Sequence, residues 1–444
     1  MSADTAFLGK LYEEICLALP DELGGKKRLR LDQSKAEYER AKALIPGGIM
    51  GSREPDNFII NEYPIYIERG KNGHCWDLDG NEFIDFMLGF GPTTIGMGIP
   101  EIDEAIKEKI DNGFCFTIPQ RTQNDLAEKL QEIIPGAERS VFCKTGTDAN
   151  IIAVRIARAY TQKEKILTGD FHGWGDFSQY GPDGGVLQST RDATIELKYG
   201  DLAAYRREAE KGNVACILIS TVTSGVMLPV LFDKEFIQGL RAIADEFNIV
   251  FICDEVRTGF RFGLDGGISM AGVVPDITCI AKAMGNGYSV GAVCGKKEIM
   301  DVLTHPHEQE GTYVTSTYFT NSLEMVAALK TIEYYQEHDV VGALREKGRY
   351  YNEGVDRMIA KHGAPLKNIG LDQMPGFAFD TEKLGVELQA KMTVTLFTYL
   401  IRSGILIHPW RQQYFAYTHT KEDLDKSLQA LDEGLLVVKE LYPW

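Results

Sequence analysis

The sequence has little that would tie the protein to a membrane or to a nucleic acid. No apolar run in its 444 residues reaches the ~20 residues that a membrane-spanning helix needs. The N-terminus, Met1-Ser-Ala-Asp-Thr5, lacks the basic and then apolar pattern of a secretory signal. The formal net charge of −17 disfavours phosphate backbones and anionic membrane surfaces as partners. These absences predict a cytoplasmic protein, and the charge does not exclude an anionic small molecule as ligand.

Cysteines and histidines give no sign of a disulfide framework or a metal site. The eight cysteines are scattered, no Cys-x-x-Cys pair occurs, and several cysteines lie in strand-like runs, as reduced buried thiols do. His305 and His307 form a close pair beside Glu308, but not at a recognised ligand spacing, so we expect no bound metal. No internal repeat or low-complexity tract is visible, and the length indicates two or three ordinary domains.

Two apolar runs end in residues of opposite charge. Asp254 follows the run 249–253, and Lys282 follows the run 277–281. Both runs are typical of buried parallel strands, whose carboxyl ends meet at the ligand-binding edge of an open α/β sheet. A lysine can form a Schiff base with a carbonyl, and a carboxylate can keep a pyridine nitrogen protonated. The pair therefore fits pyridoxal phosphate (PLP) chemistry, with a structural ion pair as the alternative.

The surrounding pattern predicts an α/β protein. A strand over 214–219, an amphipathic helix over 234–247 and the two charged strands alternate as in a mostly parallel sheet. After about residue 336 the pattern changes to helices with short strand-like runs. We expect an N-terminal segment over 1–85, a large domain over 86–330 and a smaller α+β domain over 331–444.

Two further stretches could hold a phosphate or a flat ring. Gly146 and Thr147 open a helix, where free N–H groups and the helix dipole favour an anion; an N-cap by Thr147 or Asp148 is the compatible alternative. Phe171 follows a short strand-like run and could stack on a planar ring or belong to the core. Thr317 lies in a hydroxyl-rich loop and could add a phosphate contact or cap the next helix.

Arg53 and Arg411 are candidates for an acidic substrate group, because a guanidinium fork matches a carboxylate in two-point geometry. Trp410 and Tyr414 could line the same pocket. A surface or structural role is the alternative for each of these residues.

The motifs and their order resemble the class III (subgroup II) PLP-dependent aminotransferases, and most of all their glutamate-1-semialdehyde aminomutase branch. The resemblance runs from about Tyr38 to the C-terminus. It rests on residues 45–48, 76–85, 145–149, 171–173, 254–261, 281–282, 317 and 418–420. It implies the fold type I of PLP-dependent transferases with a small domain built from both termini, amine and carbonyl substrates, and a homodimer with shared active sites.

The resemblance also implies roles by position. Lys282 would be the Schiff-base lysine and proton carrier, and Asp254 would pair with the pyridinium nitrogen. The phosphate would be bound by Gly146, Thr147 and the neighbouring subunit's Thr317. The cofactor ring would be contacted by Phe171, His172 and Val256. A substrate carboxylate would be bound by Arg53. The family's Glu-Pro-Val is Ser220-Thr221-Val222 here, and its Gly-Asn-Pro is Thr320-Asn321-Ser322.

The expected function is amino transfer from an amine donor to an oxo or aldehyde acceptor. One alternative is an aminomutase, which moves the amine within one molecule. The other is a non-catalytic PLP-fold binding protein, against which the retention of Asp254 and Lys282 speaks.

Overall fold

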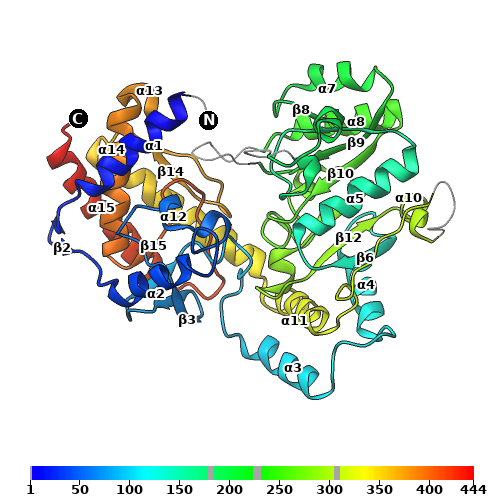
Figure 1. The fold of residues 1–444 in the computed structure, drawn as a ribbon, viewed down its shortest axis with the longest axis horizontal. Coiled ribbons are helices and arrows are strands. Elements are labelled where there is room, and N and C mark those ends of the chain that lie inside the picture. Colours follow the sequence, from blue (N-terminus) through cyan, green and yellow to red (C-terminus); the bar gives the residue numbers. More distant parts are fainter. Residues whose placement is uncertain (1–2, 179–183, 224–231, 305–310) are drawn as a thin grey trace.

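The computed structural model describes residues 3–178, 184–223, 232–304 and 311–444. Figure 1 shows two lobes: one combines the blue N-terminal elements with the orange and red C-terminal ones, and the other holds the central part of the chain. The domain boundaries expected after residues 85 and 330 stay predictions. The histidine pair at 305 and 307 lies outside the described residues.

The larger lobe is built on a mixed sheet. In the described part of the chain, its strand order is β6-β12-β11-β10-β9-β7-β8. β12 runs antiparallel to β11 and β6, and the pairings from β11 through β8 are parallel. The strands are β6 Arg139–Cys143, β7 Lys165–Thr168, β8 Thr194–Glu196, β9 Val214–Ile219, β10 Val250–Asp254, β11 Ile277–Ile280 and β12 Gly291–Gly295. The predicted, mostly parallel α/β sheet is thus confirmed.

Both faces of this sheet are covered by helices because its strands are apolar on both sides. Ile252 of β10 belongs to the cluster that includes Ile152 of α5 (Gly146–Thr161). The next residues along β10, Phe251 and Cys253, belong to the cluster that includes Leu240 of α8 (Lys234–Phe247). Successive strand residues point to opposite faces, so α5 and α8 lie on opposite sides of the sheet.

The smaller lobe joins the two ends of the chain. Its four-stranded sheet has the order β15-β5-β4-β3, and β15 (Ile405–Leu406) pairs in parallel with β5 (Glu82–Asp85). Nearby, the buried Arg402 donates two hydrogen bonds of 2.8 Å to the buried Glu62. Arg28 contacts the same carboxylate at 2.8 Å. This ion cluster ties three distant segments together.

The remaining elements complete the two lobes. The turn at 79–81 connects two antiparallel strands, and the N-terminal region contains a short hairpin between its helices. The longer helices elsewhere are α1 Ala3–Leu17, α2 Asp32–Lys42, α3 Pro100–Asp111, α4 Thr122–Ile133, α7 Leu202–Ala209, α11 Leu323–His338, α12 Val340–His362, α14 Val386–Arg402 and α15 Lys421–Leu441. The short helices are α6 Gln188–Ala193, α9 Ile268–Ala271, α10 Lys297–Met300 and α13 Thr381–Leu384. The other strands are β1 Glu22–Leu23, β2 Lys26–Lys27, β3 Ile67–Lys71, β4 His74–Asp77, β13 Leu366–Asn368 and β14 Phe377–Phe379.

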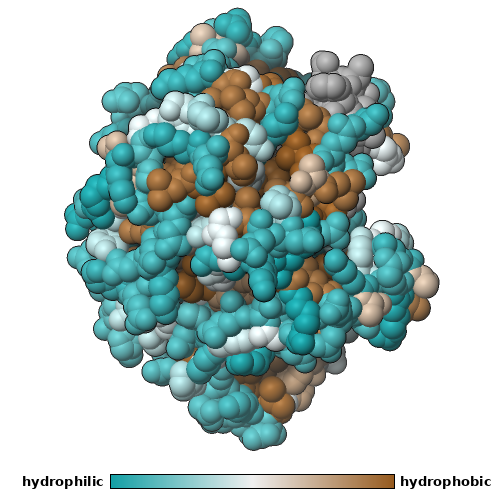
Figure 2. Space-filling view, turned by 90° about the vertical axis from the view of Figure 1, so that its left-hand side faces the viewer, coloured by the Kyte–Doolittle hydropathy of each residue, from teal (hydrophilic) through white to brown (hydrophobic). Residues whose placement is uncertain are grey.

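The surface of the smaller lobe is mainly hydrophilic. Figure 2 shows hydrophilic residues over most of this face, with hydrophobic residues gathered near its upper middle. Within the described residues, no helix combines the length and apolarity that crossing a bilayer requires.

Candidate active site

Asp254 and Lys282 lie at the carboxyl ends of neighbouring strands. Asp254 is the last residue of β10 and stands opposite Cys279 of the parallel strand β11. Lys282 follows β11 directly after Ala281 and opens a short 3₁₀ turn over Lys282–Gly285. Its φ of 51° is in the left-handed region, where a residue with a β-carbon is strained. Two strands thus deliver opposite charges to one edge of the sheet, as the sequence predicted.

Asp254 is held as an anion by three donors. Its Oδ2 accepts hydrogen bonds from His172 Nδ1 at 2.7 Å and from Asn150 Nδ2 at 2.8 Å. Its Oδ1 accepts one from the Val256 amide at 3.0 Å. Burial by itself raises the pKa of Asp254, but the hydrogen bond and charge of His172, with the other donors, outweigh it and hold the pKa below its ordinary value. The carboxylate is therefore ionised at neutral pH.

Lys282 loses its proton more readily than an ordinary lysine. Burial lowers its pKa from 10.5 to about 8, and the positive charge of Arg257 adds to this effect. Asp254 opposes the shift, while the charges of Arg261 and Arg411 reinforce it. At pH 7 most Lys282 side chains still hold the proton, but the fraction that is a neutral amine able to attack a carbonyl is far larger than for an ordinary lysine.

The predicted phosphate seat lies at the start of α5. Thr145, not Thr147 or Asp148, is the N-cap: its Oγ1 accepts from the Asp148 amide, and the Asp148 carboxylate accepts from the Thr145 amide. The N-cap interpretation of the sequence was wrong because Thr145 is extended and the helix begins one residue later, at Gly146. Gly146 and Thr147 are the first helical residues, whose N–H groups have no partner within the helix.

The residues expected around the cofactor ring meet next to this seat. A β-carbon on Gly146 would lie 2.4 Å from Val256 Cγ1, and one on Gly173 would lie 2.3 Å from Thr147 Oγ1. The start of α5 is therefore in close contact with two loops: the one that follows β10 and contains Val256, and the one that follows β7 and contains Phe171 and Gly173. Phe171 is half exposed at this junction, with 50% of its surface accessible.

These residues fit PLP. Asp254 uses three of the four or so hydrogen bonds that a carboxylate can accept, which leaves capacity for a pyridinium N–H. The helix start at Gly146 has free N–H groups that can bind a phosphate, the lack of a side chain on Gly146 lets Val256 pack against it, and the amine of Lys282 supplies the group that binds an aldehyde. One site thus offers an acceptor for the ring N–H, N–H donors for the phosphate and an amine for the aldehyde.

The two candidate substrate arginines converge on one aromatic ring. The guanidinium carbons of Arg53 and Arg411 lie 5.6 and 5.4 Å from the centre of the Phe90 ring. Both arginines are exposed, and Tyr414 is buried nearby under Arg261. Arg53 also borders a hollow lined by residues of α2 and of the segment 55–65. Residues from opposite ends of the chain thus form one basic surface.

Within one chain, Thr317 shows no described hydrogen bond to the phosphate seat at Gly146 and Thr147. It lies in the exposed loop that precedes α11. The structure of one chain therefore leaves the predicted contribution from a second subunit as a prediction.

The motif that replaces Glu-Pro-Val supports the strand end of β10. Thr221 Oγ1 donates to the buried Glu255 at 2.6 Å, Thr258 donates a further short hydrogen bond, and the Gly267 amide donates at 2.9 Å. Burial raises the pKa of Glu255 to about 7 despite these donors. The hydroxyl of Thr221 is thus part of the hydrogen-bond network that holds the buried Glu255 next to Asp254.

Three residues of the site were not identified from the sequence. Asn150 is a buried amide on the otherwise apolar face of α5, and this polar residue in an apolar stripe was the sequence signal that could have identified it. For Phe90 the sequence offered no signal beyond the neighbouring glycines. Arg257 follows Val256 directly, donates to Val222 O at 3.3 Å and comes within 3.7 Å of the Asp170 carboxylate.

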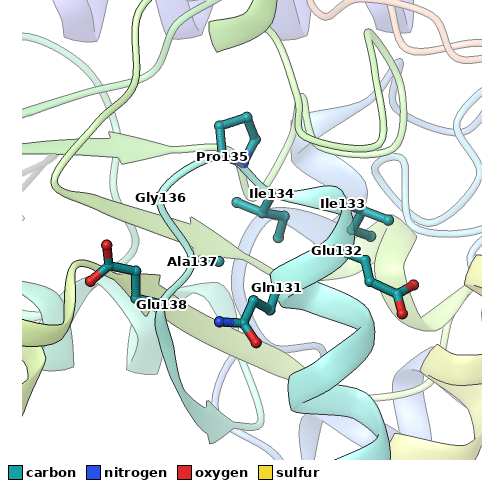
Figure 3. Close-up of a pocket in the computed structure, with 8 residues that line it drawn as sticks. All are labelled: Gln131, Glu132, Ile133, Ile134, Pro135, Gly136, Ala137 and Glu138. Carbon is teal, nitrogen blue, oxygen red and sulfur yellow. The ribbon is translucent and has the colours of Figure 1, made fainter.

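A hollow on the opposite edge of the sheet does not belong to this site. Figure 3 shows it between the end of α4 and the start of β6, formed by residues 131–138. β6 is parallel to β11, so its start lies at the edge away from Asp254. Glu138 in this hollow already accepts a hydrogen bond of 2.8 Å from the Lys297 amide.

Comparison with known proteins agrees with this geometry. Residues 59–179 and 182–435 match the family model of the class-III aminotransferases. The chain is 38% identical to the 3-aminobutyryl-CoA aminotransferase of Cloacimonas acidaminovorans, over 94% of this chain and 99% of that protein. It is 33% identical to the glutamate-1-semialdehyde 2,1-aminomutase of Chloroherpeton thalassium, over 90% of this chain and 97% of that protein.

Solved structures give the same result. The FumI protein of Sphingopyxis sp. MTA144, solved in a PLP-containing form, is 26% identical with a TM-score of 0.85, and the match covers 92% and 96% of the two chains. An omega-transaminase from Sphaerobacter thermophilus is 26% identical with a TM-score of 0.81, over 91% and 98%. The resemblance seen in the motifs is confirmed: the chain belongs to the class-III aminotransferases, enzymes that depend on PLP.

Proposed function

We propose that the chain transfers an amino group between two molecules, with Lys282 as the residue that binds the cofactor and carries the proton. The observation that carries this proposal is the pairing of an ionised Asp254 with a Lys282 of lowered pKa at adjacent strand ends. When bound, PLP supplies an aldehyde for amines and a cationic ring that stabilises negative charge on a neighbouring carbon.

Each residue of the site has a distinct task in this proposal. Asp254 keeps the ring nitrogen protonated, and His172 and Asn150 hold its carboxylate in place. Lys282, as a neutral amine, accepts the proton from the substrate's amino-bearing carbon and returns it. Val256 and Phe171 enclose the ring from the β10 and β7 sides.

We propose a homodimer in which the partner completes the phosphate site. Gly146 and Thr147 supply N–H donors from one subunit, and the partner subunit's Thr317 supplies a hydroxyl. The supporting observation is an apolar exposed region around this loop. Its large side chains are 53–75% exposed: Phe116, Ile118, Tyr313 and Tyr318. Ser322 joins their two segments by donating to Phe114 O at 3.1 Å through its amide.

The proposed donor substrate is a 3-aminoacyl compound, as a free acid or a thioester. The support is the 38% identity to a 3-aminobutyryl-CoA aminotransferase, which exceeds the 33% to an aminomutase. In this proposal Arg53 and Arg411 bind an acyl or carboxylate oxygen, since a guanidinium donates two parallel hydrogen bonds; the support is that both guanidinium groups lie beside the same Phe90 ring. The many aminomutase relatives make intramolecular transfer the second candidate.

A half-reaction panel tests the proposal. The PLP-loaded enzyme is mixed with 3-aminobutyryl-CoA, 3-aminobutyrate or glutamate-1-semialdehyde, with no oxo acid present, and the cofactor's visible absorbance is followed. We expect the first two to bleach the absorbance and an added oxo acid to restore it. Isomerisation of the semialdehyde without an added acceptor, together with no response to 3-amino compounds, would establish the aminomutase instead. Borohydride labelling of any residue other than Lys282 would refute the assigned lysine.

A further inference from the structure

Arg261 is a buried cation without a carboxylate partner. Arg261 is 1% exposed, and within the described residues no carboxylate forms an ion pair with it or acts on its pKa. Its Nη2 donates to Gly91 O at 2.6 Å and its Nε donates to Arg257 O at 3.4 Å, while its Nη1 has no hydrogen-bond partner in the part of the chain that the structure describes. An unpaired buried charge is costly, so its retention here calls for a reason beyond stability.

The guanidinium of Arg261 lies between two elements of the basic surface. Its central carbon lies 4.6 Å from the centre of the Tyr414 ring, in the segment that carries Arg411. On the other side, a β-carbon on Gly91 would come within 3.0 Å of Nη2. Arg261 therefore packs against both the turn that ends at Gly91 and the Tyr414 ring, which also lies close to Gly91, and it bonds to the turn's backbone.

That turn is strained and carries Phe90. Leu88, Gly89, Phe90 and Gly91 have φ values of 46°, 65°, 69° and 96°, all in the left-handed region. Leu88 and Phe90 have β-carbons, and such a conformation persists only when its surroundings hold it. The Asp85 carboxylate accepts from the Leu88 amide at 2.9 Å at the start of the turn. Arg261 holds the end of the turn through Gly91 O.

We propose that Arg261 is a positioning residue of the amino-transfer site: it fixes the strained turn 88–91, and thereby the Phe90 ring on which Arg53 and Arg411 receive the substrate's acyl oxygen. This proposal rests on the proposed function of those two arginines. The buried charge has a second effect, because it is one of the cations that lower the pKa of Lys282. A cation paired with a carboxylate would be largely neutralised and would act less strongly on the lysine.

Two substitutions separate the positioning role of Arg261 from the effect of its charge. Arg261→Lys keeps the charge but loses the planar, two-armed geometry that reaches Gly91 O. Arg261→Met loses both. Arg402→Met is the matched control, because Arg402 is also buried, pairs with Glu62 and lies in the smaller lobe. The control removes a buried guanidinium without touching the turn.

The first readout is discrimination between 3-aminobutyrate and 2-aminobutane, which differ in the carboxylate. In the half-reaction, both Arg261 variants should raise the KM for 3-aminobutyrate about tenfold and leave 2-aminobutane within about twofold. Arg402→Met should leave the ratio unchanged, even if it lowers the melting temperature. A ratio within twofold of wild type in the Arg261→Lys variant overturns the positioning role.

The second readout does not depend on turnover. The rate at which the apoenzyme takes up PLP is measured against pH, and its midpoint reports the deprotonation of Lys282. We expect the midpoint to rise in Arg261→Met and to stay near wild type in Arg261→Lys. If Arg261→Met does not fold while Arg402→Met does, Arg261→Lys alone decides the positioning role.

The double variant Arg53→Met with Arg411→Met separates failure of this inference from failure of the proposed function. If the double variant keeps the preference for 3-aminobutyrate, the two arginines do not bind the substrate and the proposed function fails at that point. If the double variant loses the preference while the Arg261 variants keep it, only the role of Arg261 is wrong.

Discussion

Replacing Lys282 with methionine should stabilise the apoenzyme at neutral pH. Lys282 has a pKa of about 8 in the folded protein, against 10.5 for an ordinary lysine, because burial and neighbouring arginines disfavour its charge. The folded chain without cofactor therefore bears the free-energy cost of a buried, protonated Lys282, and the unfolded chain does not. Methionine fills a similar volume without a charge and removes the penalty.

The sign and size of the effect follow from proton linkage. Below pH 8 both states hold the proton, and the folded state bears the whole penalty. Between pH 8 and pH 10.5 the unfolded chain binds more protons than the folded one, so the free energy of unfolding rises with pH. Above that window both states are neutral and the penalty has vanished. The difference between the two pKa values corresponds to at most about 3 kcal/mol.

Urea unfolding of the apoenzyme between pH 7 and pH 11, followed by circular dichroism, measures the effect. We expect Lys282→Met to be more stable than wild type at pH 7, with the difference shrinking as pH rises through the window. Lys27→Met, which removes an exposed lysine, is the control and should show no such trend. A wild-type stability that stays flat through the window, or a Lys282→Met variant that is less stable at pH 7, would contradict the reasoning.

Three further predictions concern the same residues and the smaller lobe. The rate of PLP uptake by the apoenzyme, divided by that of free Nα-acetyl-lysine at each pH, should stay constant below pH 8 and fall between pH 8 and pH 10.5, because Lys282 is then already neutral while the free lysine is still losing its proton; a ratio constant across the whole range would show an unperturbed Lys282. His172→Phe removes one of the strongest donors to Asp254 and should lower kcat about 10- to 100-fold while PLP still binds. Single-turnover absorbance measures the rate of the reaction. Near-normal turnover would show that His172 does not support Asp254. Glu62→Gln leaves Arg402 buried without its anion and should cost about 3–5 kcal/mol of unfolding free energy by urea titration, with an unchanged KM; a loss below about 1 kcal/mol would show that the cluster is dispensable.

The features that depend on short sequence spans were predictable. The runs ending at Asp254 and Ala281 have the apolar composition of buried strands, and their place at one sheet edge follows from βαβ handedness and strand direction. The motif order from about Tyr38 onward identified the family, and the family model and relatives confirm it. Helix ends were less certain, because Thr145, Thr147 and Asp148 are all good cap residues and only backbone conformation selects among them.

Contacts between distant segments could not be read from the sequence. Phe90 brings Arg53 and Arg411 together across some 360 residues, and neither arginine carries a local signal of the other. The sequence around Arg261 does not distinguish it from an ordinary surface arginine. In the described structure it is buried and has no carboxylate partner. Long-range packing decides both features, and periodicity reports only the neighbourhood of each residue.

The pairing of β15 with β5 has a consequence for how the protein is made. A ribosome releases the strands of the N-terminal segment long before residues 402–406 are synthesised, so β5 and Glu62 wait for their partners until the chain is nearly complete. During that interval the nascent chain exposes an unpaired strand edge and an unneutralised carboxylate. Premature termination before Arg402 should therefore yield a species that depends on chaperones and is prone to degradation, even though the central sheet would already be present.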